Sequence, residues 1–203
     1  MYNKFSPESI ENYAKKLIGK TFKDAVGEKD IKGKGGLGVL LEEHYFGYKP
    51  NSDKEPDFKE AGVELKSTPY KKNKNSTYSA KERLVLNIIN YMKDYEGDFE
   101  QSGFYKKNKL ILLIYYFFDK ELDKLDYPIN YVHLFEFPEV DLEIIKRDWE
   151  TIVNKIKEGK AHEISEADTI YLSACTKGAN KECVREQPFS NIVAKQRAFS
   201  LKP

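Results

Sequence analysis

Cysteine and histidine are scarce in this sequence. Its 203 residues include two cysteines, Cys175 and Cys183, and three histidines. These are too few for a zinc cluster of the usual Cys and His spacing, and too sparse for a disulfide-stabilised scaffold. We therefore expect a reduced, cytoplasmic protein.

An excess of charge of one sign is also missing. The chain has 34 Lys and Arg residues against 33 Asp and Glu residues, for a formal net charge of +1. Composition alone therefore gives no sign of a polyanionic partner. No apolar run has the length of a membrane span, and the chain begins with polar and charged residues where a signal peptide needs an apolar core. We expect no membrane segment, and any argument for nucleic-acid binding depends on where the charges lie.

Aromatic residues, by contrast, are plentiful. The 14 Tyr and 12 Phe, with 40% hydrophobic residues overall, exclude a disordered chain and predict a single globular unit. Hydrophobic periodicity predicts helices over 7–18, 33–46 and 141–158, and strands over 61–67, 84–89, 110–118, 131–137 and 169–173. The polar, basic stretch 70–83 is predicted to be a loop. The fold class that follows is α/β, with a mixed β-sheet flanked by helices.

Two familiar types of site are disfavoured. The glycines of 33–38 are not followed by Lys-Ser or Lys-Thr, and no clear strand precedes them, so a nucleotide-binding loop is a weak hypothesis beside a simple entry to a helix. No serine or cysteine lies in a nucleophile motif. His44 falls on the apolar face of its predicted helix, which indicates a core histidine rather than a catalytic one.

The stretch 55–66, EPDFKEAGVELK, combines acids and a lysine in an unusual way. On a strand, Glu64 and Lys66 project to one face, and Asp57 can converge on them from the preceding turn. Clustered carboxylates repel one another unless a cation lies between them. Mg²⁺, held by carboxylates, the carbonyl of Leu65 and waters, would relieve that repulsion, and the lysine could then neutralise charge on a scissile phosphate. The alternative is an ordinary surface ion pair, which is commoner for this pattern.

The surrounding sequence distinguishes these alternatives. Its segments resemble, in order and spacing, the mismatch-repair endonuclease MutH and the Sau-type GATC-cutting type II restriction endonucleases; they are 34–42, 56–57, 61–69, 81–91, 148–150, 158–163, 171–180 and 194–202. The resemblance implies the restriction-endonuclease-like α/β core with a PD-(D/E)xK site. It also implies that residues 1–203 form a single MutH-like catalytic domain, a fragment of a longer two-domain enzyme.

Residue by residue, the resemblance implies the roles of individual positions. Asp57, Glu64, the Leu65 carbonyl and Glu42 correspond to metal ligands, with one or two Mg²⁺ ions. Lys66 and Lys107 correspond to active-site lysines, with Lys106 and Lys109 as neighbouring candidates for the second. Lys34 corresponds to a lysine near the DNA backbone, and Thr176 and Lys177 to a loop that reads the major groove, where lysine can donate to guanine O6 and N7. Arg197 belongs to the basic tail that follows this loop.

The function implied is Mg²⁺-dependent hydrolysis of phosphodiester bonds in double-stranded DNA at GATC, with possible dimerisation on DNA. A MutH-like methyl-directed nickase and a catalytically silent GATC-binding effector domain are the alternatives. A silent copy would be expected to have lost its acids, whereas Asp57, Glu64 and Lys66 are all present. The expected DNA-facing side also carries basic residues at Lys71, Lys72, Lys74, Lys81, Arg83, Lys181, Arg185 and Lys195.

Overall fold

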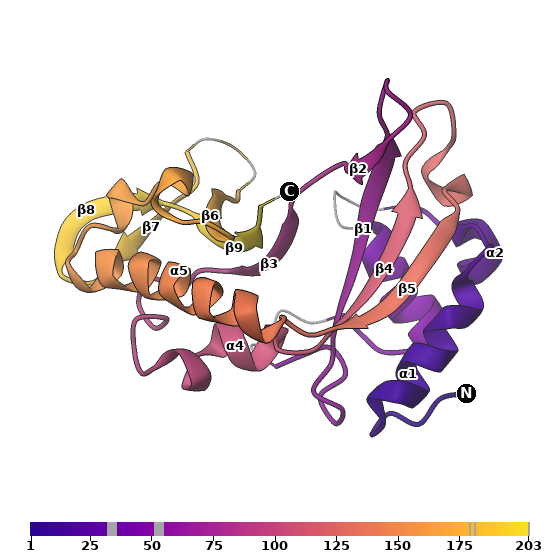
Figure 1. Ribbon diagram of the computed structural model, residues 1–203, viewed down its shortest axis with the longest axis horizontal. Coiled ribbons are helices and arrows are strands. Elements are labelled where there is room, and N and C mark those ends of the chain that lie inside the picture. The colour runs from indigo at the N-terminus through magenta and orange to yellow at the C-terminus, as the bar shows by residue number, and fades with distance from the viewer. Residues whose placement is uncertain (32–35, 51–54, 179, 181, 203) are drawn as a thin grey trace. The chain divides into compact units, whose positions relative to one another are not determined.

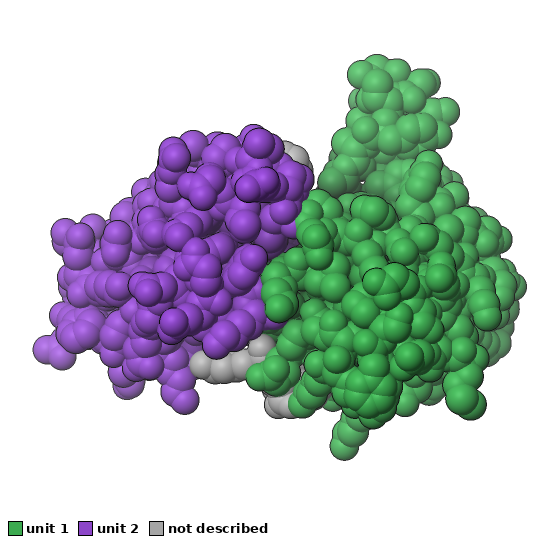
Figure 2. Space-filling model, turned by 60° about the horizontal axis from the view of Figure 1, so that its bottom comes forward, with its two compact units in different colours: residues 1–82, 107–136 green, residues 83–106, 137–203 purple. Residues whose placement is uncertain are grey.

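The computed structural model describes residues 1–31, 36–50, 55–178, 180 and 182–202. These residues divide into two compact units, shown in Figure 2. Unit 1 comprises 1–82 and 107–136, and unit 2 comprises 83–106 and 137–203. The assignment of residues 1–203 to one catalytic domain stays a prediction, in which these units would be its two parts.

A four-stranded sheet organises unit 1 (Figure 1). Its order is β2-β1-β4-β5, built from β1 (Glu64–Lys72), β2 (Tyr78–Ala80), β4 (Ile111–Phe117) and β5 (Ile129–Phe135). β1 runs parallel to β4, while β2 and β5 run antiparallel to their neighbours. The predicted mixed sheet is thereby confirmed.

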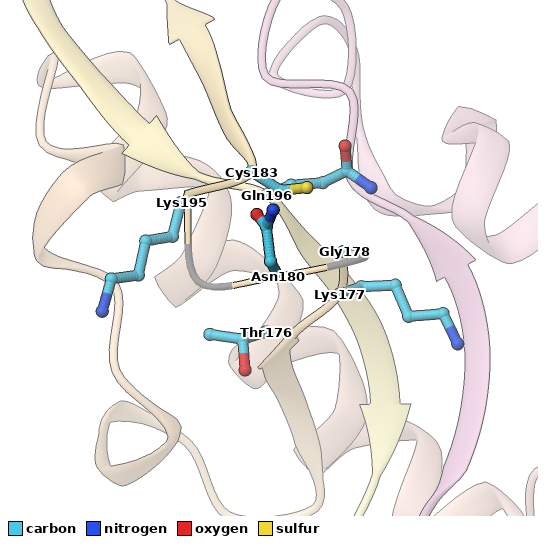
Figure 3. A pocket seen from close by; sticks show the side chains of 7 residues that line it. All are labelled: Thr176, Lys177, Gly178, Asn180, Cys183, Lys195 and Gln196. Atoms are coloured by element: carbon cyan, nitrogen blue, oxygen red, sulfur yellow. The ribbon is translucent and has the colours of Figure 1, made fainter.

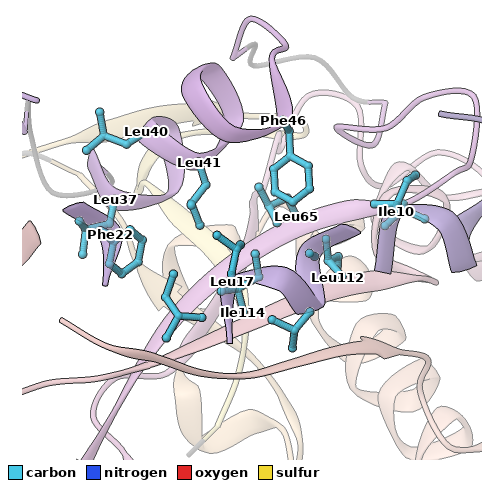
Figure 4. Close-up of a cluster of buried hydrophobic side chains, with 14 of the residues drawn as sticks. Ile10, Leu17, Phe22, Leu37, Leu40, Leu41, Phe46, Leu65, Leu112 and Ile114 are labelled. Atoms are coloured by element: carbon cyan, nitrogen blue, oxygen red, sulfur yellow. The ribbon is translucent and has the colours of Figure 1, made fainter. Parts of the chain in front are cut away.

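β4 is an inner strand of this sheet, and both of its faces are apolar over its first four residues. Ile111, Leu112, Leu113 and Ile114 are all buried, as expected for a strand that is covered on both sides. Leu112 and Ile114 join Leu65 of β1 in the main hydrophobic cluster of the unit (Figure 4). Alternation along β1 then places Glu64 and Lys66 on the face opposite Leu65.

Helices cover the Leu65 side of this sheet. The predicted first helix is confirmed as α1 (Pro7–Ala14) with a 3₁₀ turn, η1 (Lys15–Leu17); Ser6 caps it by accepting a hydrogen bond from Ser9 N–H. The predicted second helix is α3 (Gly36–Leu40), continued by the π-helix η2 (Leu41–Phe46). A short helix that the periodicity does not predict, α2 (Phe22–Val26), lies between them, and η4 (Lys124–Asp126) precedes β5.

The prediction of a loop over 70–83 is wrong. β1 starts later than predicted and continues to Lys72, and β2 folds back on it with the pairs Tyr70↔Ala80, Lys71↔Ser79 and Lys72↔Tyr78. The hairpin escapes pattern reading because all three residues of β2 are exposed, so no apolar alternation marks the strand.

The prediction for His44 is also wrong. The side chain is exposed and lies 3.9 Å from the Glu43 carboxylate rather than in the core. The cause is the π-helical turn over Leu41–Phe46. Its wider i→i+5 turn shifts the residues away from the faces that a 3.6-residue period assigns to them.

Unit 2 is built on a three-stranded antiparallel sheet of order β3-β9-β6, formed by β3 (Leu84–Ile88), β9 (Arg197–Leu201) and β6 (Leu172–Thr176). The long helix α5 (Glu139–Lys157) contributes Trp149 and Ile152 to the core. The carboxylate of its buried Asp148 accepts hydrogen bonds from the backbone N–H groups of Ile170, Tyr171 and Leu172, at 2.6–2.8 Å. This contact fixes the start of β6.

The C-terminal region contains more strands than predicted. The strand expected over 169–173 begins only at Leu172, and the basic loop expected after it contains the hairpin of β7 (Val184–Gln187) and β8 (Ser190–Lys195). Short helical elements complete the unit: η3 (Phe99–Gln101), η5 (Ala161–Glu163), η6 (Glu166–Asp168) and the first part of α4 (Gly103–Asn108), whose last two residues belong to unit 1. Among the described residues, no helix combines the length and apolar character needed to cross a bilayer.

Candidate active site

A tight turn brings Asp57 to the start of β1. Phe58 and Val63 pair across it, with hydrogen bonds from Phe58 N to Val63 O and back at 2.9 and 3.2 Å. The turn closes at Gly62, whose φ of +67° strongly favours glycine. The Asp57 carboxylate consequently accepts the Leu65 N–H at 2.9 Å, and the Asp57 N–H lies 3.3 Å from Glu64 Oε2.

Two lysines hold the Glu64 carboxylate. Lys66 Nζ lies 2.6 Å from Oε1, and Lys107 Nζ lies 3.6 Å from Oε2. Lys107 comes from the last turn of α4 and also donates to the Glu55 carbonyl at 3.2 Å. The Glu64 side chain is only 2% exposed. Burial is the main cause that raises the pKa of this carboxyl, and the nearby lysines oppose it.

Glu42 reaches the same cluster from helix η2. A Cβ added at Gly38 would lie 3.2 Å from Ser67 Oγ, so this glycine lets α3 approach β1 closely. Burial, followed by the charges of Asp57 and Glu64, raises the pKa of Glu42 to about 7, while Lys66 lowers it. Three carboxylates and two ammonium groups therefore share one region, with acid in excess.

Tyr48 is a member of this region that sequence reasoning missed. Its hydroxyl is buried and has no hydrogen-bond partner among the described residues. Burial first, and then the charges of Asp57, Glu42 and Glu64, raise the pKa of Tyr48. The signal available in the sequence was its position six residues after Glu42, across the turn that ends η2.

The donor chemistry of this cluster fits a hard divalent cation. Carboxylate oxygens are the preferred ligands of Mg²⁺, which keeps several waters and needs only one or two protein carboxylates. In the part of the chain that the structure describes, no group of three or more His, Cys, Asp or Glu side chains is arranged to hold a metal ion. Asp57 and Glu64 supply two carboxylates of this kind, and the roles of Asp57, Glu64, Glu42 and the Leu65 carbonyl as metal ligands stay predictions.

The predicted reading loop lies in unit 2. Thr176 ends β6, and Lys177 N–H donates to the Gln196 carbonyl at 2.8 Å. This loop helps to form a pocket of about 400 Å³, which is lined by Thr176, Lys177, Gly178, Asn180, Cys183, Lys195 and Gln196. In Figure 3 the side chains of Lys177 and Lys195 extend in opposite directions from it. Arg197 donates to the Ala174 carbonyl at 2.6 Å, and Lys34 lies outside the described residues.

Comparison with known proteins adds an independent finding. Residues 46–148 match the family described as DNA mismatch repair enzyme MutH. The matched segment contains Asp57, Glu64, Lys66 and Lys107. The chain belongs to the MutH family. Its α/β fold agrees with that membership.

The chain covers a different share of the length of each relative. It is 49% identical over 205 residues to the type II restriction enzyme Sau3AI of Staphylococcus aureus, but covers only 42% of that protein's length. It is 30% identical over 176 residues to the DNA mismatch repair protein MutH of Shewanella woodyi, covering 72% of it. The MutH of Buchnera aphidicola is 27% identical over 198 residues, with 86% of its length covered.

Glu42 provides a stability test of the acidic cluster in this MutH-family chain. Glu42→Gln should stabilise the protein by about 1–2 kcal/mol at pH 8 in chelator, because it removes a half-buried charge beside two other carboxylates. The folded-state pKa of about 7 lies above the ordinary 4.5, so ionisation destabilises the fold increasingly between these pH values. The gain should therefore be absent near pH 4.5 and complete above 7.

Thermal unfolding across this pH range measures the effect. Glu43→Gln is the matched control, since Glu43 is exposed and adjacent in sequence, and it should change stability little at any pH. A loss of stability in Glu42→Gln at pH 8 would show that Glu42 does not experience the repulsion inferred above.

Proposed function

We propose that this chain is the catalytic domain of a divalent-metal-dependent endonuclease that hydrolyses phosphodiester bonds of double-stranded DNA at GATC. The observation that carries the proposal is the buried Glu64 carboxylate, held between Lys66 and Lys107 and joined to Asp57 through the backbone of β1. An ordinary surface ion pair would be exposed, whereas Glu64 is 2% exposed. Membership of the MutH family and the likeness to a type II restriction enzyme support the same reaction.

Each residue then has a task in the proposed reaction. Asp57 and Glu64 would hold Mg²⁺, which when bound polarises the phosphate and activates water. Lys66 would neutralise charge that develops on the scissile phosphate, because its side chain is 19% exposed and its ammonium group lies next to the acids. Lys107, 12% exposed, would hold the Glu64 carboxylate in place. Tyr48 provides a buried hydroxyl in the same region.

Recognition is proposed to reside in the Thr176–Lys177 loop. Lysine in a major groove donates to guanine O6 and N7, and Asn180 and Gln196, which line the adjoining pocket, carry amide groups that can pair with base edges. The backbone hydrogen bond between Lys177 and Gln196 supports the role because it limits the movement of the loop. Lys34 and Arg197 remain proposed DNA contacts, and a DNA-acting enzyme of this kind is proposed to work in the cytoplasm.

A MutH-like nickase is the second candidate. The chain covers 72% and 86% of two relatives named as mismatch repair proteins, against 42% of the restriction enzyme. Its identity to the restriction enzyme is higher, at 49% against 27% and 30% for the two mismatch repair proteins. For the restriction-enzyme candidate we also propose a further C-terminal domain and dimerisation on DNA.

Incubation with DNA tests the proposal directly. The protein should cut duplexes that contain GATC and leave duplexes without it intact, with Mg²⁺ present and not with chelator. Supercoiled plasmid distinguishes the two candidates, since a nickase yields only open circles and a restriction enzyme yields linear DNA. Absence of any Mg²⁺-dependent cut, with DNA binding retained, would favour the catalytically silent effector domain instead.

A further inference from the structure

The β1–β2 hairpin carries a concentration of positive charge that the proposed active site does not use. Residues 67–81 contain four lysines and no Asp or Glu. Lys71, Lys72 and Lys74 are exposed. Within the described part of the chain, none of these three ammonium groups forms an ion pair.

The end of the hairpin extends past the other strands of the four-stranded sheet. β1 pairs with β4 only as far as Tyr70↔Phe117, so Lys71 and Lys72 are paired with β2 alone. Figure 1 draws this two-stranded end projecting past the helices of unit 1, and Figure 2 shows a narrow projection on the same unit. A basic projection of this kind presents its charges to a partner rather than to the body of its own unit.

Contacts within unit 1 hold the hairpin in one conformation before any partner binds. Tyr70 contacts Tyr78, Phe117 and Tyr131, with ring centroids 5.4–5.9 Å apart. At the tip, Asn73 N–H donates to the Thr77 carbonyl at 2.8 Å, and the Asn73 side chain bonds the Thr77 hydroxyl at 3.0 Å. A preorganised surface loses little conformational entropy when it binds.

Protection of a sheet edge does not explain all of these lysines. Edge strands often carry lysine to prevent pairing with another chain. Past Tyr70, β1 has no strand on its β4 side among the described residues, so this role can account for Lys71 and Lys72, but Lys74 lies in the turn beyond both strands. The charges therefore point to a polyanion.

We propose that this hairpin binds the phosphate backbone of DNA flanking the cleavage site, an inference that rests on the proposed endonuclease function. Alternation places Lys72 on the same face of β1 as Lys66. The six residue steps from Lys66 to Lys72 span about 20 Å at the rise of a β-strand, which corresponds to about six base pairs at 3.4 Å each. The hairpin thus reaches phosphates well outside a four-base-pair target.

Uncharged backbone substitutions test the contact without changing the base sequence. One GATC duplex is unmodified, and a second carries methylphosphonates about five to seven base pairs from GATC on both sides. Affinities are measured in chelator, at several salt concentrations, for the wild type and for Lys71→Ala/Lys72→Ala/Lys74→Ala. Lys16→Ala/Lys20→Ala/Lys124→Ala, on exposed lysines of the helix side of unit 1, is the matched control.

On the unmodified duplex, the hairpin variant should bind about tenfold more weakly than the wild type, with a salt slope smaller by about 3. On the modified duplex the two proteins should bind alike, and the control should match the wild type throughout. Equal losses on both duplexes, or none on either, would overturn the hairpin contact. A wild type that neither binds nor cuts GATC DNA would instead overturn the proposed function.

Discussion

Asp57→Asn should lower the rate of DNA cleavage by about 10³-fold or more. The Asp57 carboxylate accepts the Leu65 N–H at 2.9 Å, and the amide oxygen of asparagine can accept the same hydrogen bond. The substitution thus removes a charge from the cluster without removing the contact that shapes the turn. Single-turnover cleavage of a GATC duplex in Mg²⁺ measures the loss.

Binding separates this loss from a folding defect. The affinity of Asp57→Asn for the duplex in chelator should be unchanged or higher, since a negative charge near the phosphate has been removed. Glu60→Gln is the matched control: Glu60 lies in the same turn, 37% exposed, and pairs with Lys4. It should cleave at the wild-type rate. An Asp57→Asn protein of full activity would refute the assignment of this site.

The sequence predicted correctly those structural features that a local pattern of residues determines. The apolar run of β4 reveals a strand covered on both faces, and the alternation of Glu64 and Lys66 with Val63 and Leu65 reveals which side chains share a face. These features are local, and they were predicted correctly. Lys107 was also selected, through family resemblance, and the structure brings it to Glu64 at 3.6 Å.

Features that depend on tertiary contacts could not be read in this way. The exposed strand β2 has no apolar face to produce a period, and the π-helical turn moved His44 out of the core. The proximity of Glu42 to Asp57 depends on the close approach at Gly38 and Ser67, which no spacing in the sequence encodes. Tyr48 was missed for the same reason.

The lysine that holds Glu64 gives the second large expected effect. Lys66→Met should destabilise the protein by about 3 kcal/mol in chelator at pH 8, because removing one partner of a buried pair leaves an uncompensated charge. Lys66 Nζ is the nearer partner of Glu64, at 2.6 Å against 3.6 Å for Lys107. Lys107→Met should therefore cost less. Urea unfolding measures both.

A double variant shows whether the loss comes from Glu64. Lys66→Met/Glu64→Gln should recover most of the lost stability, since the buried Glu64 charge is removed together with its nearer partner. The coupling energy between the two positions should then be about 2 kcal/mol. Additive effects would mean that solvent reaches Glu64 despite its 2% exposure, and the surface ion pair would again explain the motif. A strong coupling instead identifies a charge kept in the protein interior at a cost in stability, as expected of a residue retained for catalysis.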